Sequence, residues 1–378
     1  MRIAIVGAGH AGIAAAEAAS KQGARAVVFS AETALPYFRP RIVGVAAGLE
    51  TEAAIAFHPR PWFDERGIDL RLGAPVESVE RRADGFEVVA AGGASERFDR
   101  VILAMGAGPL TPPLYATPHP RLSPLWTMAD AQSIRARLTP GTRLAVIGGG
   151  ILGLELALAA AGRPGVAVTL IERGPRLMGA QLGTLVSSAL GAELARRGIE
   201  VRTSADIERL NEQGDALALG FASGAALSAE LVVYALGARP ALALAQQMGL
   251  AVGRGVQVSA ALETSLPGVF ACGDVAEFEG IARSIAIEAV KQGRVAGENA
   301  AGGSALYRTA GAPLSYRQPG FEILAIGPAE PEGAEVRALA VEGGTCALVV
   351  QAGRLVGVQA LNARAAFREH EQRLGQAV

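Results

Sequence analysis

Two stretches of the chain repeat the same order of apolar and polar positions. Residues 2–6 and 143–147 are short aliphatic runs behind one arginine, a pattern typical of a strand that is buried on both faces of a parallel sheet. Each run is followed by glycines at fixed spacing and then by a segment rich in alanine and leucine, which predicts a helix to about Gln22 and to about Ala161. The pattern therefore predicts two strand–turn–helix units in one chain.

The glycines between each predicted strand and helix follow the spacing G-x-G-x-x-G. The first glycine makes a tight turn, the second lets the backbone approach a pyrophosphate, and the third lets the helix pack closely on the strand. One such spacing in a chain with 48 glycines could be an ordinary turn, but two in the same context favour two dinucleotide sites. The predicted phosphate-binding residues are Gly7, Gly9, His10, Ala11 and Gly12 in the first turn and Gly148, Gly150, Ile151, Leu152 and Gly153 in the second.

An acidic residue follows each turn at the distance expected for a ribose contact. Glu32 and Glu172 lie 25 and 24 residues beyond the first glycine of their turns, each near the end of the next predicted strand. A carboxylate there can accept hydrogen bonds from both hydroxyls of an adenosine ribose. At the second site it favours NADH, because a 2′-phosphate would face an anion, although Arg173 and Arg176 keep NADPH open as the less favoured cofactor. We therefore predict FAD at one site and NAD(P)H at the other.

Composition excludes several classes of protein. The 378 residues allow two or three domains, and a net charge of −1 argues against a nucleic-acid binder. Two cysteines suit a reducing cytoplasm, and four scattered histidines show no metal-ligand spacing, so we assign no metal. Residues 1–16 and 144–162 are apolar enough to resemble a signal peptide or a membrane span, but both coincide with a strand–turn–helix pattern. We therefore expect a cytoplasmic protein without a membrane segment.

Three further segments resemble motifs of the two-dinucleotide-binding flavoproteins, also called the pyridine nucleotide-disulfide oxidoreductase-like family. Residues 101–107 are similar to the strand and turn where the family's chain leaves the FAD domain, and residues 231–240 to the matching exit from the NAD domain. Residues 264–274 resemble the family's second FAD motif, whose aspartate hydrogen-bonds the ribityl hydroxyls. The residue types of this last motif also allow a plain helix N-cap at Asp274. The cofactor positions that the resemblance implies are Ala104, Gly106, Gly273 and Asp274 for FAD and Gly237 for NADH.

The resemblance implies an α/β fold with two Rossmann-like dinucleotide-binding domains, as in glutathione reductase, and a small α+β C-terminal domain. The implied FAD-binding domain is discontinuous and comprises residues 1–107 and 238–302. The NAD(P)H-binding domain would comprise residues 108–237, and the C-terminal domain residues 303–378.

The segment after the second predicted strand favours one branch of the family. No cysteine occurs between residues 1 and 100, so the thiol chemistry of the disulfide reductases has no nucleophile. Residues 35–42 are similar instead to a segment of the NADH-dependent rubredoxin, ferredoxin and nitrite reductase flavoproteins, in which Arg39 and Pro40 would run past the FAD. That branch commonly carries a lysine a few positions later, whereas this chain has Val43 and Gly44.

Two glutamates are predicted to act at the cofactors. Glu155 stands two residues past the third glycine of the second turn, where it could simply favour the positive end of a helix. In the family a glutamate at this place lies near the nicotinamide and the flavin, and we take Glu155 as the catalytic and NADH-binding candidate. Glu288 lies on a predicted helix over 284–300, which in the family points its N-terminus at the flavin, and is taken as an FAD-binding candidate.

The resemblance implies an FAD-dependent NAD(P)H oxidoreductase that passes hydride from NADH to flavin and electrons on to a carrier protein such as a rubredoxin or ferredoxin. One alternative is an NADH diaphorase or oxidase that uses quinone or dioxygen. Another is a flavin-bound subunit of a multi-subunit oxidoreductase, whose NAD site would be defective. The missing thiol site and the short C-terminal part leave monomer and dimer both open.

Overall fold

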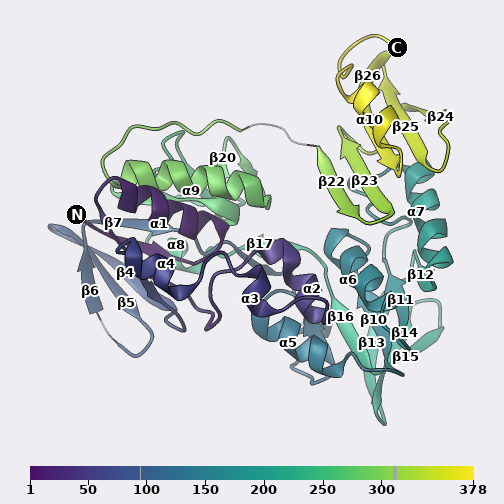
Figure 1. Ribbon diagram of the computed structural model, residues 1–378, viewed down its shortest axis with the longest axis horizontal. Helices are drawn as coiled ribbons and strands as arrows, with labels where there is room; N and C mark the ends of the chain where they lie inside the picture. The colour runs from purple at the N-terminus through teal and green to yellow at the C-terminus, as the bar shows by residue number, and fades with distance from the viewer. Residues whose placement is uncertain (94, 310–312) are drawn as a thin grey trace. The chain divides into compact units, whose positions relative to one another are not determined.

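The computed structural model describes residues 1–93, 95–309 and 313–378 (Figure 1). The chain divides into two compact units, each built from separate stretches of sequence. The first unit comprises Met1–Leu110, Trp126–Ala129 and Ala238–Thr309, and the second comprises Thr111–Leu125, Asp130–Gly237 and Ala310–Val378. The predicted boundaries of three domains, at residues 107, 237 and 302, stay a prediction.

A five-stranded parallel sheet forms the centre of the first unit, in the order β19-β7-β1-β2-β3. Its strands are β1 (Arg2–Val6), β2 (Arg25–Phe29), β3 (Asp69–Arg71), β7 (Arg100–Leu103) and β19 (Val269–Ala271). Apolar clusters cover both faces, one of them against helices α1 (His10–Lys21) and α9 (Ala286–Ala300). Because both faces are covered, the strands consist of continuous aliphatic runs, as the sequence predicts.

Shorter elements surround this sheet. They are η1 (Arg39–Arg41), α2 (Ile42–Ala46), α3 (Glu52–Ile55), α4 (Arg60–Glu65), β4 (Val76–Arg82), β5 (Gly85–Ala90), β6 (Ser95–Phe98), β8 (Ala107–Pro109), β17 (Ala238–Pro240), α8 (Ala243–Gln247), β18 (Val256–Val258), η3 (Gly273–Val275), β20 (Ala276–Phe278) and β21 (Ile281–Ala282). Strands β8 and β17 pair antiparallel; β8 ends just before the chain leaves the first unit after Leu110, and β17 begins where the chain returns to it at Ala238.

The second unit repeats the same design. Its parallel sheet has the order β12-β11-β10-β16-β9. Its elements are η2 (Pro113–Tyr115), β9 (Leu122–Pro124), α5 (Met128–Arg137), β10 (Arg143–Ile147), α6 (Ile151–Ala161), β11 (Ala167–Ile171), α7 (Thr184–Arg196), β12 (Ile199–Arg202), β13 (Ile207–Gln213), β14 (Ala216–Phe221), β15 (Ala226–Ala229) and β16 (Leu231–Tyr234). In α5, Met128 and Ala129 belong to the first unit.

The C-terminal part forms an antiparallel sheet that belongs to the second unit. The order is β22-β23-β26-β25-β24, with β22 (Leu314–Gln318), β23 (Phe321–Ile326), β24 (Glu335–Leu339), β25 (Thr345–Gln351), β26 (Arg354–Leu361) and helix α10 (Arg364–Glu371). Gln359 on β26 accepts a 2.7 Å hydrogen bond from the backbone amide of Gly183, the residue that precedes α7. The predicted class, two Rossmann-like sheets and a small α+β part, is confirmed. No helix within the described ranges is both long and apolar enough to cross a bilayer.

Helices α1 and α9 pack with almost no side chain between them, and Figure 1 shows them side by side. A Cβ atom on Gly293 would clash with the carbonyl oxygen of Ala11, and one on Gly297 with that of Ala15. Glycine at these two positions therefore lets the helix that follows the first glycine turn touch a helix that begins 276 residues later in sequence.

We expect Gly297→Ala to lower the free energy of unfolding by about 1–3 kcal/mol, because the added methyl must push α9 away from α1. Gly191→Ala is the matched control, since Gly191 lies within α7 with nothing within 4 Å of its Cβ position. There the change should raise stability by roughly 0.5–1 kcal/mol. Urea unfolding followed by circular dichroism measures both, and equal stability of the two variants would contradict the close approach.

Candidate functional site

The first glycine turn joins β1 to α1. Gly7 has φ +111°, and a side chain there would clash with the carbonyl group of Ala104. A side chain on Gly12 would in turn clash with the carbonyl oxygen of Gly7. Gly9 differs, because nothing lies within 4 Å of its Cβ position. It is the N-cap residue of α1, and no side chain caps the helix there. The turn thus leaves open space at the helix N-terminus, which suits a phosphate.

The second turn, between β10 and α6, has the same geometry. Gly148 also has φ +111° and faces the carbonyl group of Ala235, and Gly153 faces the carbonyl oxygen of Gly148. Gly150, the N-cap residue of α6, again has nothing within 4 Å of its Cβ position, and no side chain caps the helix there. The counterpart of Ala104 is therefore Ala235, which sequence reasoning left out of the site although it stands in the exit motif two residues before Gly237. Both turns fit a pyrophosphate.

The acidic residue of the second turn binds the turn itself. Glu172 follows β11 and accepts backbone hydrogen bonds from Gly149, at 2.7 Å, and from Gly174, at 2.6 Å. Its carboxylate therefore lies beside the glycine turn, at the carboxyl end of the sheet, where a dinucleotide binds in this fold.

The acidic residue of the first turn is held by more partners. Glu32 accepts hydrogen bonds from the Tyr37 hydroxyl at 2.9 Å and from the Met128 backbone amide at 3.0 Å, and it pairs with Arg39 at 3.0 Å. Arg39 also donates to the backbone carbonyl of Trp126 and lies over its ring. The structure thus brings Glu32 and Arg39 together, and their predicted contacts with FAD stay predictions.

His10, the first residue of α1, is packed among aromatic rings. Phe57 and Phe38 approach it edge-on, with ring centroids 4.8 and 5.8 Å away. Burial, with the nearby positive charge of Arg39, lowers the pKa of His10 to about 4. The imidazole is therefore neutral at pH 7 and can bind a ligand only as a neutral donor or acceptor.

The second FAD motif lies directly against the first turn. Gly273 has φ +78°, and a Cβ there would come within 2.8 Å of the Ala11 side chain. Its amide donates a 2.7 Å hydrogen bond to the side chain of Gln292 on α9. Burial raises the pKa of the neighbouring Asp274, against the opposing effects of a hydrogen bond from Ser284 and the charge of Arg39. Residues about 260 positions apart in sequence therefore meet at one place, as the resemblance implies.

The remaining predicted positions are distributed around these turns. Pro40 lies in η1, Gly106 and Gly237 have positive φ values of +68° and +97°, and the Gly106 carbonyl accepts a 3.0 Å hydrogen bond from Ala241. Ile151 and Leu152 open α6 as the predicted first turn of that helix.

Glu288 lies in the first turn of α9 and is 1% exposed. Its two carboxylate oxygens accept hydrogen bonds from Lys291 at 2.7 Å and from Tyr307 at 2.6 Å. Burial by itself would raise the pKa of Glu288, but these two donors hold it below its ordinary value. Sequence reasoning did not single out Tyr307, because the helix ends before it and no spacing links it to Glu288.

Glu155 is half-buried on α6 among leucines. Burial raises the pKa of its carboxyl to about 7. The Tyr316 hydroxyl on β22 has a raised pKa through burial and, secondly, through the negative charge of Glu155, so the two side chains influence each other within the second unit. A carboxyl of this kind exchanges a proton near neutral pH.

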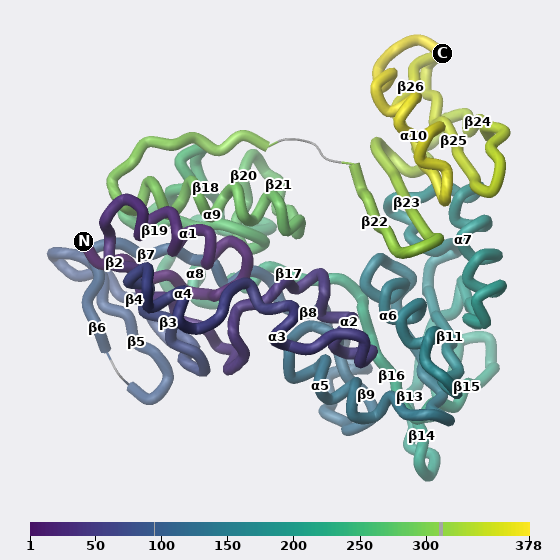
Figure 2. The backbone as a smooth tube through the Cα atoms, in the orientation of Figure 1, coloured from purple at the N-terminus to yellow at the C-terminus, as the bar shows by residue number. Residues whose placement is uncertain are grey.

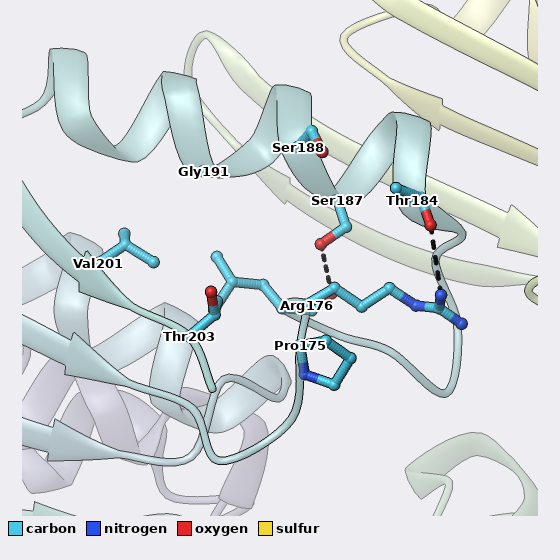
Figure 3. A pocket seen from close by; sticks show the side chains of 9 residues that line it. Pro175, Arg176, Thr184, Ser187, Ser188, Gly191, Val201 and Thr203 are labelled. Carbon is cyan, nitrogen blue, oxygen red and sulfur yellow. Dashed lines mark hydrogen bonds between the residues drawn. The ribbon is translucent and has the colours of Figure 1, made fainter. Parts of the chain in front are cut away.

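A cavity of about 270 Å³ lies between the loop after β11, helix α7 and the end of β12. Figure 3 shows the Arg176 side chain extending along it toward Thr184. Arg176 pairs with Glu330 at 2.9 Å, and Glu330 also accepts hydrogen bonds from the amide and hydroxyl of Thr184. The positive charge of Arg176 is therefore already compensated.

Neither cysteine is suited to redox exchange. Burial raises the pKa of the Cys272 thiol to about 12 and that of the Cys346 thiol to about 11, and both side chains are buried. A thiol must ionise to attack a disulfide. Among the described residues, no group of three or more histidine, cysteine, aspartate or glutamate side chains could hold a metal ion.

The raised pKa of Glu155 predicts how stability depends on pH. Between about pH 4.5, the ordinary pKa, and pH 7 the unfolded chain ionises this carboxyl while the folded chain keeps the proton, so stability falls as pH rises through this window. The Glu155→Gln variant has no carboxyl at this position, so its stability does not fall in this way as pH rises. We expect the stability of the variant relative to wild type to rise between pH 4 and pH 8, by at most about 3 kcal/mol. Urea unfolding across this range tests it, and a pH-independent difference would contradict the buried carboxyl.

Comparison with known proteins identifies a family and relatives that this chain resembles. The family model described as pyridine nucleotide-disulphide oxidoreductase matches residues 1–299. The chain is 35% identical over 278 residues to the biphenyl dioxygenase system ferredoxin–NAD(+) reductase component of Paraburkholderia xenovorans (strain LB400), covering 72% of this chain and 67% of that one. It is 32% identical over 281 residues to the rubredoxin-NAD(+) reductase of Pseudomonas putida, covering 73% and 72%.

Solved structures share the whole fold. The putidaredoxin reductase–putidaredoxin complex aligns with a TM-score of 0.87 at 24% identity, covering 98% of this chain and 92% of that one. NADH:rubredoxin oxidoreductase from Clostridium acetobutylicum aligns with a TM-score of 0.83 at 24% identity, covering 100% and 96%. With two glycine turns of matching geometry and a family match over most of its length, this chain belongs to the pyridine nucleotide-disulphide oxidoreductase family.

Proposed function

We propose that this protein is an FAD-dependent NADH oxidoreductase that passes electrons to a carrier protein of the rubredoxin or ferredoxin type. The observation that carries the proposal is the pair of glycine turns, which have the same φ at the first glycine and the same open space at the second. Relatives named as ferredoxin and rubredoxin reductases support the choice of acceptor.

FAD is assigned to the first unit. The turn after β1 would hold the pyrophosphate, and the half-buried carboxyl of Asp274, next to the Gly273 that contacts Ala11, would meet the ribityl chain. Arg39 would lie along the cofactor, held in place by Glu32 and Trp126. The assigned residues are Gly7, Gly9, His10, Ala11, Gly12, Glu32, Arg39, Pro40, Ala104, Gly106, Gly273, Asp274 and, through its place on α9, Glu288.

NADH is assigned to the turn after β10 in the second unit. Glu172 would accept the ribose hydroxyls, and the amides at the start of α6 would face the pyrophosphate. NADH is favoured over NADPH because Glu172 is an anion and because Glu330 compensates the charge of Arg176. The assigned residues are Gly148, Gly150, Ile151, Leu152, Gly153, Glu155, Glu172 and Gly237.

In the proposed mechanism the residues of this chain act mainly by binding and orienting the two dinucleotides. When bound, FAD supplies the chemistry that side chains lack, since it accepts a hydride and releases electrons singly. The glycine turns bind and orient both dinucleotides, and Glu155 can hold or release a proton near neutral pH. Because both thiols are buried with raised pKa values, the chain has no disulfide relay of its own and the electrons must leave to an external acceptor.

Anaerobic mixing of the purified yellow protein with NADH, and separately with NADPH, tests this function. We expect NADH to bleach the flavin absorbance rapidly and NADPH to do so more slowly, and the reduced protein to be reoxidised by added rubredoxin or ferredoxin. A flavin that neither nucleotide reduces would reject the proposal in favour of a flavin-bound subunit. Reoxidation by quinone or dioxygen alone would identify a diaphorase or oxidase.

The pairing of Arg176 with Glu330 yields a prediction on cofactor preference. Glu330→Gln keeps an acceptor for Thr184 but releases the guanidinium, which can then meet a 2′-phosphate. We expect the ratio of kcat/KM for NADPH to that for NADH to rise by about fivefold, since an exposed charge contact contributes on the order of 1 kcal/mol. Glu335→Gln, which breaks the Arg337 pair on β24, is the matched control and should leave the ratio unchanged.

A further inference from the structure

The segment that leaves α9 runs back along the helix instead of away from it. We call residues 303–309 the strap. The side-chain amide of Asn299 donates to the Ala305 carbonyl at 2.8 Å, and its oxygen accepts from the Ala305 amide at 2.7 Å. The Tyr307 amide donates to Ala260 at 2.8 Å. Figure 2 traces this segment along the length of α9, so the strap brings residues far along the chain back to the first turn of that helix.

Tyr307 joins the strap to the start of α9. It is 4% exposed, and its hydroxyl donates a 2.6 Å hydrogen bond to Glu288. Lys291 donates to the other oxygen of the same carboxylate at 2.7 Å. The Tyr307 ring also packs edge-on against Phe278, with centroids 5.2 Å apart. The carboxylate therefore has one donor from its own helix and one from the strap.

The start of α9 also contacts the second FAD motif, residues 264–274. Gln292 is 6% exposed and accepts the 2.7 Å hydrogen bond from Gly273, next to Asp274. The Gln292 side chain also lies near the Tyr307 hydroxyl, where it opposes the rise that burial causes in the pKa of that hydroxyl. Because α9 touches α1 directly at Gly293, a shift of its first turns would displace both elements that are assigned to FAD.

We propose that Tyr307 is a positioning residue of the FAD site, which fixes the first turns of α9 through Glu288 and thereby, through the hydrogen bond between Gln292 and Gly273, sets the place of Gly273 and Asp274. In this role Glu288 acts through the helix and not as a direct contact to the cofactor. The inference rests on the proposed binding of FAD to the first unit. It means that the strap and the cofactor site are coupled, and FAD should bind more tightly when the strap is docked.

Removal of the Tyr307 hydroxyl should weaken this site specifically. A buried carboxylate that loses one of its two hydrogen-bond donors still bears the free-energy cost of desolvation, but less of that cost is offset. The loss of one such hydrogen bond corresponds to about a tenfold change in an equilibrium constant. Tyr307→Phe retains the ring that packs on Phe278. We therefore expect about tenfold weaker FAD binding to the apoprotein and a shifted flavin absorption maximum in the reconstituted protein.

The experiment compares wild type, Tyr307→Phe, Glu288→Gln, the double variant and Tyr115→Phe. Tyr115 is a buried tyrosine of the second unit and is the matched control, expected to bind FAD as wild type does. The dissociation constant of FAD is measured by flavin fluorescence on stripped protein, and unfolding of each apoprotein is measured in parallel. If the two residues act as one unit, the double variant should bind FAD no more weakly than the weaker single variant.

The outcomes separate the competing explanations. Wild-type affinity and an unshifted spectrum in Tyr307→Phe, with weak binding in Glu288→Gln, would overturn the proposal and make Glu288 a direct contact. If Tyr307→Phe does not fold, Asn299→Ala removes the two hydrogen bonds that hold Ala305 of the strap, and unchanged FAD affinity in that variant would equally overturn the proposal. Absence of FAD binding by wild type would instead reject the proposed function itself.

Discussion

The two cofactor turns of this protein depend on backbone contacts that no side chain would permit. At Gly7 and Gly148 the chain turns at φ +111° directly against the carbonyl group of the residue that follows the neighbouring strand. The third glycine of each turn then packs against the carbonyl oxygen of the first. These contacts place each helix N-terminus at the carboxyl end of its sheet. They leave the middle glycine open, so the same packing that closes the turn also creates the space for a ligand.

Helix α9 extends this constraint through the first unit. Its glycines bring it onto α1, its Gln292 binds the second FAD motif, and its Glu288 binds the strap. A helix near the end of the unit thereby fixes the turn at its beginning. The second unit has a comparable link, in which Glu330 and Gln359 of the C-terminal part hold the start of α7. In each unit, contacts with a segment near its end therefore fix a helix from an earlier part of the chain.

The carboxylates show how much of the candidate site residue spacing can predict. The distance from the glycines predicts Glu32 and Glu172; Glu172 directly follows β11, and Glu32 lies three residues beyond the end of β2. Their partners could not be located in this way: Glu32 binds Tyr37, Arg39 and Met128, whereas Glu172 binds the amides of its own turn. Glu288 was recognised only by its place on a helix, and Tyr307, its partner, carried no signal at all.

The sequence alone determined the elements that local pattern governs: the aliphatic strands, the glycine turns, the helices behind them and therefore the α/β class with two dinucleotide sites. These follow from short-range rules, because a buried strand and a tight turn restrict the residues that form them wherever they occur. Only the tertiary structure decided which charges meet. The pairing of Arg176 with Glu330, the burial that raises the pKa of Glu155 and the return of Tyr307 to Glu288 depend on how separate segments pack, and a single sequence holds no record of such contacts.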